Sequence, residues 1–240
     1  MIRETPGGDA IDPVDLQLSF PRRGGDHPWV VGNFVTTIDG AAVVDGGATG
    51  INDEDDIAMF AAMRVAADFV LVGAETVKAE NYGPITLDER RRRARLDAGL
   101  EEFPHLVIAS RSLNIEPGAR VFSDPDHRPT ILTVEDAPGD QVLALSEVAD
   151  VVRLKDTSPE SIVHYLRMAG VVLCEGGPSI WGQFIAARLV DEQALTVSPM
   201  LVSGSSTRMA RGTEAKPPVG MRLDRVHYGD RSIFLRYLRA

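Results

Sequence analysis

Short, uninterrupted runs of Val, Ile and Leu recur along the chain, and this feature most limits the folds it can adopt. Helical segments separate most of these runs, which lie at 29–35, 69–73, 105–109, 130–134, 150–154, 171–174 and 194–198. A run without polar alternation predicts a strand that is buried on both faces. Strands of this kind with intervening helices predict a mostly parallel sheet that is covered by helices on both sides.

Capping residues and helix breakers predict where helices begin and end. Asn52 precedes three acidic residues and is expected to cap the helix that follows, since carboxylates are favourable in a first helical turn. A second helix is predicted over 158–170, and a third begins at Pro178. The last apolar runs, 225–228 and 232–238, are close enough to form a hairpin, so the sheet is predicted to be mixed.

The chain is predicted to form one α/β domain with an N-terminal extension. Residues 1–28 are rich in Pro, Gly and Asp and are interpreted as the extension. No linker or low-complexity segment interrupts the rest, and a 240-residue chain with 44% hydrophobic residues can bury a large core. We therefore expect a single domain over 29–240.

The charge and the cysteine content exclude several classes of protein. A formal net charge of −10 disfavours binding to nucleic acid or to anionic membranes, which carry the same sign. Cys174 is the one cysteine, so an internal disulfide is impossible, and the histidines lie too far apart for a predicted metal site. The N-terminus lacks a signal-peptide pattern, and no run reaches the roughly 20 apolar residues of a membrane span. We expect a soluble cytoplasmic protein.

The segment Glu175-Gly176-Gly177-Pro178-Ser179 carries the strongest functional signal. It connects a predicted strand to a predicted helix, at the edge of the sheet where open α/β proteins bind ligands. Two glycines let the backbone approach a bound group, and the N-terminus of the following helix can bind a phosphate. The carboxylate of Glu175 would repel that phosphate, so it fits better as an acceptor for a substrate donor. The alternative is a structural turn, which this pattern also forms.

Two more strand ends carry polar groups. Thr76, in the segment 73–77, places a hydroxyl near the same edge of the sheet, and the alternative, which the residues alone favour, is a helix cap. Ser110-Arg111-Ser112 follows the strand at 105–109, and its guanidinium and hydroxyls can hold a phosphate monoester such as the 2′-phosphate of NADP. The alternative for this tripeptide is an ordinary polar turn.

Two further segments are ambiguous from their residues alone. The segment 36–40 ends the first strand, and its Asp39 is either a functional carboxylate or part of an Asp-Gly turn. The run Arg90 to Arg93 is flanked by acidic residues, which is typical of a solvated helix face, and a contact to a substrate phosphate is the alternative. The chain has no P-loop and no G-x-G-x-x-G after its first strand, so the commonest nucleotide-binding motifs are excluded.

In chain order, these segments resemble the pyrimidine reductases of riboflavin biosynthesis, which share the dihydrofolate-reductase fold. The resemblance rests on Asn33 to Gly40, Gly73 to Val77 with Glu80, Glu175 to Ile180, Leu189 to Glu192 and Pro199 to Gly204. It spans the chain from Trp29 onward. It implies a three-layer α/β fold and hydride transfer from NADPH to the ribose C1′ of 5-amino-6-(5-phosphoribosylamino)uracil, which opens the sugar to a ribityl chain.

The resemblance also implies roles for individual residues. Asp39 and Glu175 are the catalytic candidates, and Thr49, Arg64 and Glu175 would face the substrate. The candidates for binding NADPH are Thr36, Gly73, Thr76, Glu80, Ser110, Arg111, Gly176, Gly177, Pro178, Ser179, Ile180 and Gln183. No metal is expected, and a homodimer is expected because members of the family commonly form one.

The sequence departs from the family pattern in the segment after Val77. Glu80 stands where the family usually has aspartate, and residues 81–93 do not contain the expected basic contact to the substrate phosphate at a recognisable position. The H-x-E and P-C-x-x-C motifs of the zinc deaminase that is fused to some members are absent. Two alternatives therefore stay open. One is a reductase of the same fold that acts on dihydrofolate or on another pteridine or pyrimidine, and the other is a nucleotide-binding homologue without catalysis.

Overall fold

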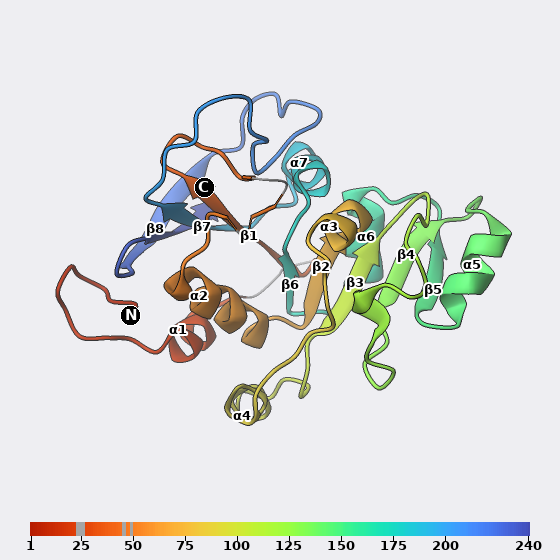
Figure 1. Ribbon diagram of the computed structural model, residues 1–240, viewed down its shortest axis with the longest axis horizontal. Coiled ribbons are helices and arrows are strands. Elements are labelled where there is room, and N and C mark those ends of the chain that lie inside the picture. Colours follow the sequence, from red (N-terminus) through yellow and green to blue (C-terminus); the bar gives the residue numbers. More distant parts are fainter. Residues whose placement is uncertain (23–26, 45–46, 49) are drawn as a thin grey trace.

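The protein is built around one sheet of nine strands in the order β5-β4-β3-β2-β6-β1-β7-β9-β8 (Figure 1). A computed structural model describes residues 1–22, 27–44, 47–48 and 50–240. The strands are β1 (Trp29–Thr37), β2 (Phe69–Gly73), β3 (His105–Ala109), β4 (Thr130–Val134), β5 (Asp150–Leu154), β6 (Val171–Cys174), β7 (Glu192–Ser198), β8 (Met221–Tyr228) and β9 (Ile233–Arg239). Neighbours from β5 to β7 are parallel, whereas β9 is antiparallel to β7 and to β8. The predicted mixed, mostly parallel sheet and its C-terminal hairpin are confirmed.

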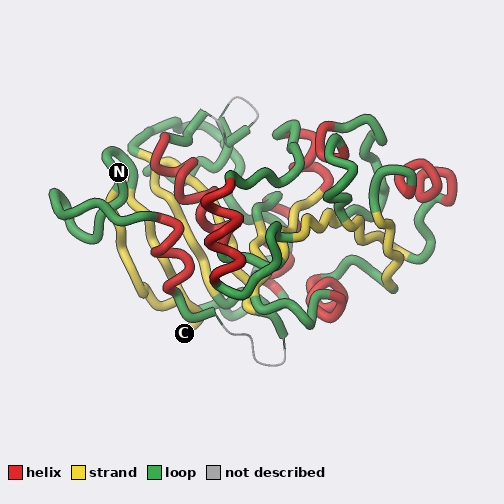
Figure 2. Tube along the Cα trace, turned by 90° about the horizontal axis from the view of Figure 1, so that it is seen from below, coloured by secondary structure: helices red, strands yellow, loops and turns green. Residues whose placement is uncertain are grey.

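Helices lie on both sides of the strands, which gives the three layers that are visible in Figure 2. They are α1 (Pro13–Ser19), α2 (Glu54–Val65), α3 (Ala74–Ala79), α4 (Glu89–Asp97), α5 (Gly139–Ser146), α6 (Pro159–Tyr165) and α7 (Pro178–Ala186), with a short 3-10 helix over Arg120–Phe122. The predicted start of α7 at Pro178 is confirmed.

The sheet separates two hydrophobic cores because successive side chains of a strand point to opposite faces. In β2, Val70 and Val72 belong to the core that contains Met63 of α2, whereas Leu71 belongs to the core of Trp181 in α7. All three strand residues are completely buried. Burial on both faces is the physical reason for the uninterrupted apolar runs of the sequence.

Two of the predicted helix boundaries are wrong. The N-cap of α2 is Asp53, whose carboxylate accepts a hydrogen bond of 2.8 Å from the backbone N–H of Asp56, so Asn52 lies one residue outside the helix. The Asp53 carboxylate also accepts from the Ser232 hydroxyl, which fixes it at the cap position. Helix α6 ends at Tyr165 rather than at Gly170, because the buried Leu166 forms its C-cap and the chain turns there.

The first 22 residues pack against the sheet and helix α2. Val14 of α1 lies in a small apolar cluster with Ala62 and Val65 of α2. Beyond α1, Arg22 forms a buried ion pair of 2.8 Å with Glu192 of β7. Burial alone would raise the pKa of Glu192, but its cationic neighbours Arg22 and Arg236 lower it to about 2. The N-terminal segment therefore completes a charged network in the interior rather than extending away from the molecule.

Gly32 of β1 lies against the indole of Trp181, so we predict that Gly32→Ala destabilises the fold. A methyl group at this position would lie 2.1 Å from Cζ2 of Trp181, which is completely buried. Overpacking of this kind costs about 1–3 kcal/mol or more of unfolding free energy. Urea unfolding followed by tryptophan fluorescence measures it. Gly139→Ala is the matched control, since no atom lies within 4 Å of its added methyl group. Equal losses for both variants would contradict the packing argument.

Candidate functional site

Two adjoining cavities lie where the central parallel strands end. The inner cavity, of about 140 Å³, lies between helix α2, helix α3 and the start of α7. The outer cleft, of about 490 Å³, lies over the ends of β2 and β3 and along α7. The residues that line both are Val43, Thr76, Glu80, Gly177 and Pro178. The two cavities are therefore adjacent along these five residues.

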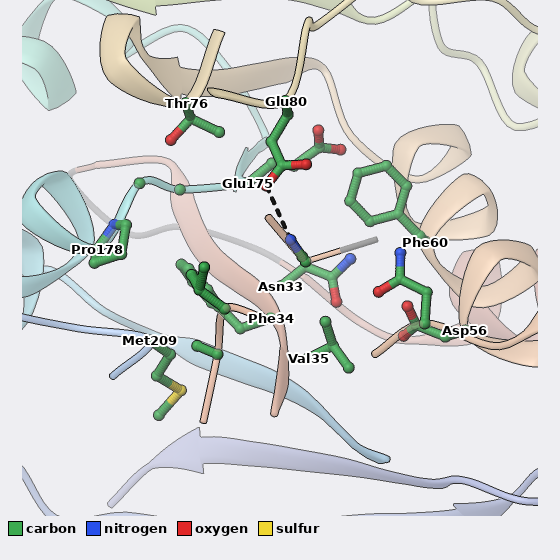
Figure 3. Close-up of a pocket in the computed structure, with 16 residues that line it drawn as sticks. Asn33, Phe34, Val35, Asp56, Phe60, Thr76, Glu80, Glu175, Pro178 and Met209 are labelled. Carbon is green, nitrogen blue, oxygen red and sulfur yellow. Dashed lines mark hydrogen bonds between the residues drawn. The ribbon is translucent and has the colours of Figure 1, made fainter. Parts of the chain in front are cut away.

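The inner cavity has apolar walls and several polar groups (Figure 3). Asp56 and Phe60 of α2 lie on one side of it, and Pro178 lies on the opposite side. The apolar lining is Phe34, Val35, Ala42, Val43, Ala48, Phe60, Pro178 and Met209. The polar side chains are Asn33, Asn52, Asp56, Thr76, Glu80 and Glu175. This combination of apolar walls and a few polar groups is typical of a site for a flat heterocycle.

The predicted turn Glu175-Gly176-Gly177 forms part of the wall between the two cavities. Its carbonyl at Gly176 accepts a hydrogen bond of 2.8 Å from the N–H of Gly73, at the end of β2. Gly176 has a φ of +105°, a conformation that favours glycine. A methyl group on Gly177 would lie 2.5 Å from the Thr76 hydroxyl. Thr76 thus lies inside α3, against this backbone, and does not cap the helix, whose N-cap is Gly73.

Glu175 is held by two side chains that come from different elements. Arg64 of α2 donates from Nε and Nη2 to its two carboxylate oxygens, both at 2.7 Å, and the Tyr82 hydroxyl donates to the same carboxylate. Burial alone would lower the pKa of Arg64, but the carboxylate of Glu175 raises it, so the guanidinium keeps its charge. The contact of Tyr82 with Glu175 was not predicted. Tyr82 lies in the segment that departs from the family pattern, so no motif indicated it.

Asp56 is a second functional candidate that sequence reasoning missed. It lines the inner cavity and is only 7% exposed. Burial raises the pKa of its carboxyl group, and a hydrogen bond with Thr196 of β7 offsets this only in part. In the sequence it is one of three acids in a first helical turn, so the pattern indicates a contribution to helix stability and not a position in a cavity.

The outer cleft collects almost all of the predicted cofactor-binding residues. Its lining includes Gly73, Thr76, Glu80, Ser110, Arg111, Gly177, Pro178, Ser179, Ile180 and Gln183. Gly176 lines the inner cavity instead, and Thr36 is buried and lines neither. The cleft thus holds the N-terminal turn of α7, which favours phosphate, together with the hydroxyl and guanidinium groups that follow β3.

Arg211 is a further cation in the outer cleft that the sequence did not indicate. It comes from the long segment between β7 and β8, and its Nε donates a 3.0 Å hydrogen bond to the Ser179 hydroxyl at the start of α7. Its backbone N–H donates to the carbonyl of Pro178 at 2.9 Å. The guanidinium is therefore fixed beside the same helix N-terminus that the glycine turn precedes.

Asp39 fixes a turn and lines neither cavity. Its carboxylate accepts from the Thr37 hydroxyl at 2.5 Å and from the backbone N–H groups of Val202 and Ser203 at 3.0 and 2.6 Å. The Thr37 and backbone hydrogen bonds lower the pKa of this exposed carboxyl group. These contacts join the end of β1 to the loop after β7. A catalytic role for Asp39 stays a prediction, and Thr49 lies outside the described residues.

The Arg90 to Arg93 run forms ion pairs on helix α4. Its four side chains bond with Asp12, Asp88, Glu102 and Asp97, respectively. None of the four arginines lines the inner cavity or the outer cleft. Among the described residues, no group of three or more His, Cys, Asp and Glu side chains could hold a metal ion, and no helix is long and apolar enough to cross a membrane.

Comparisons with known proteins agree with this geometry. The RibD C-terminal domain family matches residues 28–234. A 2,5-diamino-6-ribosylamino-4(3H)-pyrimidinone 5′-phosphate reductase from Methanothermobacter thermautotrophicus is 28% identical over 187 residues, which are 76% of this chain and 82% of that protein. The riboflavin biosynthesis protein RibD from Mycobacterium tuberculosis is 30% identical over 200 residues, which are 82% of this chain and 49% of that protein.

Solved structures give the same result at the level of the fold. A pyrimidine reductase-like protein from Corynebacterium diphtheriae superposes with a TM-score of 0.79 at 26% identity, covering 90% of this chain and 93% of that one. Dihydrofolate reductase from Enterococcus faecalis superposes with a TM-score of 0.50 at 12% identity, covering 88% and 96%. The second match concerns the fold alone, and it confirms the predicted dihydrofolate-reductase-like architecture.

We predict that Arg64→Ala destabilises the protein because it removes the cation that pairs with the carboxylate of Glu175. The side chain of Glu175 is only 1% exposed, so without Arg64 it becomes a buried charge that lacks its cation. The expected loss is about 3–5 kcal/mol of unfolding free energy, measured by urea denaturation. Adding Glu175→Gln should recover part of this loss because the amide carries no charge. Arg167→Ala, on an exposed turn, is the control. Equal losses in the single and double variants would contradict the ion-pair account.

Proposed function

This chain belongs to the RibD C-terminal reductase domain family, and we propose that it is an NADPH-dependent pyrimidine reductase of the riboflavin-pathway type. The observation that carries the proposal is the pair of adjoining cavities, because hydride transfer needs the cofactor and the substrate in direct contact, and the two cavities meet at Thr76 and Gly177. The outer cleft has phosphate-binding groups and the inner cavity has the size and polarity for a heterocycle.

The residues of the outer cleft fit NADPH. Arg111 makes no ion pair with any described residue, so its guanidinium is available for the adenosine 2′-phosphate, together with the hydroxyls of Ser110 and Ser112. The N-terminus of α7 and Arg211 are placed for the pyrophosphate. Gly177 and Thr76, in the wall shared with the inner cavity, would then lie by the nicotinamide end. Contacts from Thr36 and Gly176 remain part of this proposal.

The chain's own residues would bind and orient the two reactants. NADPH supplies the hydride, which the family resemblance directs to the ribose C1′ of a phosphoribosylaminopyrimidine. Glu175 would face the substrate from the lining of the inner cavity, and Arg64 and Tyr82 fix the orientation of its carboxylate. Walls built from Phe34, Phe60 and other apolar groups exclude water from the transfer.

The pyrimidine ring itself has two candidate forms. The sequence resemblance points to 5-amino-6-(5-phosphoribosylamino)uracil, whereas the name of the Methanothermobacter relative contains a ring with an amino group at C2. The two forms differ at C2 and not at the ribose carbon that is reduced. The reaction class is therefore the same for both.

A second candidate substrate is dihydrofolate or another pteridine. None of the described residues that line the inner cavity is Lys or Arg, and three of them, Asp56, Glu80 and Glu175, carry carboxyl groups. This lining repels a phosphate, which would have to lie outside the inner cavity. A heterocycle without a phosphate would avoid that conflict.

Oxidation of NADPH, followed by absorbance, tests the proposal with the two phosphoribosylaminopyrimidines and with dihydrofolate in parallel. Turnover of either pyrimidine supports the riboflavin-type function, and turnover of dihydrofolate alone supports the second candidate. Thermal stabilisation by NADPH without any turnover would instead indicate a nucleotide-binding homologue that lacks catalysis. No stabilisation by NADPH would refute the cofactor assignment.

We predict that Arg111→Ala weakens NADPH binding much more than NADH binding, because only NADPH carries the 2′-phosphate. A charge-assisted hydrogen bond contributes about 1.5–3 kcal/mol, so a loss of roughly 10- to 100-fold in NADPH affinity is expected. Titration of the cofactor against the intrinsic tryptophan fluorescence measures both affinities. Arg167→Ala removes an exposed arginine far from the cleft and should change neither. An equal loss for NADPH and NADH would refute the assignment of Arg111.

A further inference from the structure

The carboxyl group of Asp56 does not cap its own helix. Asp56 is the third residue of α2, where an acid often supports the N-terminus, but Asp53 already caps this helix through the backbone N–H of Asp56. No backbone N–H among the described residues donates to the Asp56 carboxylate. The side chain reaches the inner cavity instead (Figure 3).

The surroundings of Asp56 do not compensate its charge. From α2, its neighbour Asp53 is another carboxylate, and from β7 the Thr196 hydroxyl is its one polar partner among the described residues. Glu80 and Glu175 line the same cavity, and the cation Arg64 is committed to Glu175. A carboxyl group that is 93% buried with a single neutral partner is costly, and a bound donor group would offset this cost.

The position of Asp56 fixes which part of a substrate it meets. It lies across the inner cavity from Pro178, and Pro178 lies in the wall that the cavity shares with the outer cleft. The atom that receives hydride must face that wall, so the sugar-bearing side of a pyrimidine points toward Pro178. The opposite ring edge, which contains N3 and C2, then points toward Asp56.

Two ring chemistries present different groups at this edge. A 2-amino-4-oxopyrimidine presents N3–H and the 2-amino group side by side, and these two parallel donors match the two oxygens of one carboxylate. A uracil presents N3–H beside the C2 carbonyl, whose oxygen would face one carboxylate oxygen, acceptor against acceptor. A site that accepts a hydrogen bond from a ligand discriminates strongly against an analogue that lacks this donor, because the buried acceptor of the site then stays unpaired.

We propose that Asp56 is a specificity-determining residue that selects a ring with the 2-amino-4-oxopyrimidine edge over the corresponding uracil. The proposal rests on the reductase function proposed above and specifies its substrate class. The same edge occurs in a 2,5-diaminopyrimidinone and in a pterin such as dihydrofolate, so the experiment includes both sources.

The test compares the intact protein with Asp56→Asn on three substrates: the 2,5-diaminopyrimidinone ribosylamino phosphate, its uracil counterpart and dihydrofolate. The unmodified protein should prefer the 2-amino pyrimidine by at least about tenfold in kcat/KM. Asp56→Asn should remove this preference, because its amide N–H clashes with the ring donors and can instead donate to the C2 carbonyl of the uracil. Glu54→Gln is the matched control, since it removes an exposed carboxylate from the same helical turn outside the inner cavity and should leave the ratio unchanged.

Each outcome of this comparison decides the proposal separately from the reductase function. A preference of the unmodified protein for the uracil, or a ratio that Asp56→Asn does not change, overturns the role of Asp56 and leaves the reductase function standing. The protein could instead turn over dihydrofolate alone. If Asp56→Asn abolishes this turnover and Glu54→Gln keeps it, the result supports the role of Asp56 and identifies a pterin, rather than the ribosylamino pyrimidine, as the substrate.

A binding measurement covers the case in which nothing is turned over. The NADPH-saturated protein is heated with 2-aminopyrimidin-4-one or with uracil, and the two increases in melting temperature are compared. The comparison measures the same preference without catalysis. A preference for the 2-amino ring that disappears in Asp56→Asn supports the proposal, and equal stabilisation overturns it. Should Asp56→Asn unfold, Asp56→Ser removes the carboxylate without adding volume, and the same loss of preference is expected from it.

Discussion

The hydrogen bond from Gly73 to the carbonyl of Gly176 joins the ends of two parallel strands, and the whole site depends on that junction. It holds the glycine turn after β6 against the first turn of α3, where Thr76 leaves room only for a hydrogen on Gly177. The turn then forms a wall with a cavity on either side. Because parallel strands end at one edge of the sheet, groups that are 100 residues apart in sequence share this wall.

Sequence reasoning predicted best the features that local chemistry determines. The apolar runs located the strands because burial on both faces leaves no polar alternation, and residues such as Val70 to Val72 are fully buried. The predicted cofactor-binding residues Ser110, Arg111 and Gly177 line one cleft because each lies just after a strand, and the ends of parallel strands meet in space. Helix ends were less predictable. Asp53 rather than Asn52 caps α2, and the Asp53 carboxylate also accepts a hydrogen bond from the distant Ser232, which no local pattern indicates.

The residues that sequence reasoning missed are those that only tertiary contacts bring to the site. Asp56 has the local pattern of a helix-stabilising acid, and its position in a cavity follows from how α2 packs beside β7. Tyr82 reaches Glu175 across 93 positions of sequence, and Arg211 comes from a segment without a motif. Asp39 was singled out by a family motif, and the structure adds its hydrogen bonds from the backbone of Val202 and Ser203, which sequence reasoning did not predict. Its catalytic role stays a prediction.

The two cavities differ in their charged groups, because among the described residues arginine side chains line only the outer cleft. The net charge of −10 is a property of the whole molecule, but binding depends on local groups. In the outer cleft, Arg111, Arg211 and the N-terminus of α7 offer groups that can bind an anion, and they lie in the same lining as the carboxylates of Glu75 and Glu80. The inner cavity contains carboxyl groups and no described lysine or arginine in its lining, so it disfavours phosphate and favours donor-rich rings. The two cavities meet at Gly177, and the difference between their linings supports the proposal that cofactor and substrate lie on different sides of this turn.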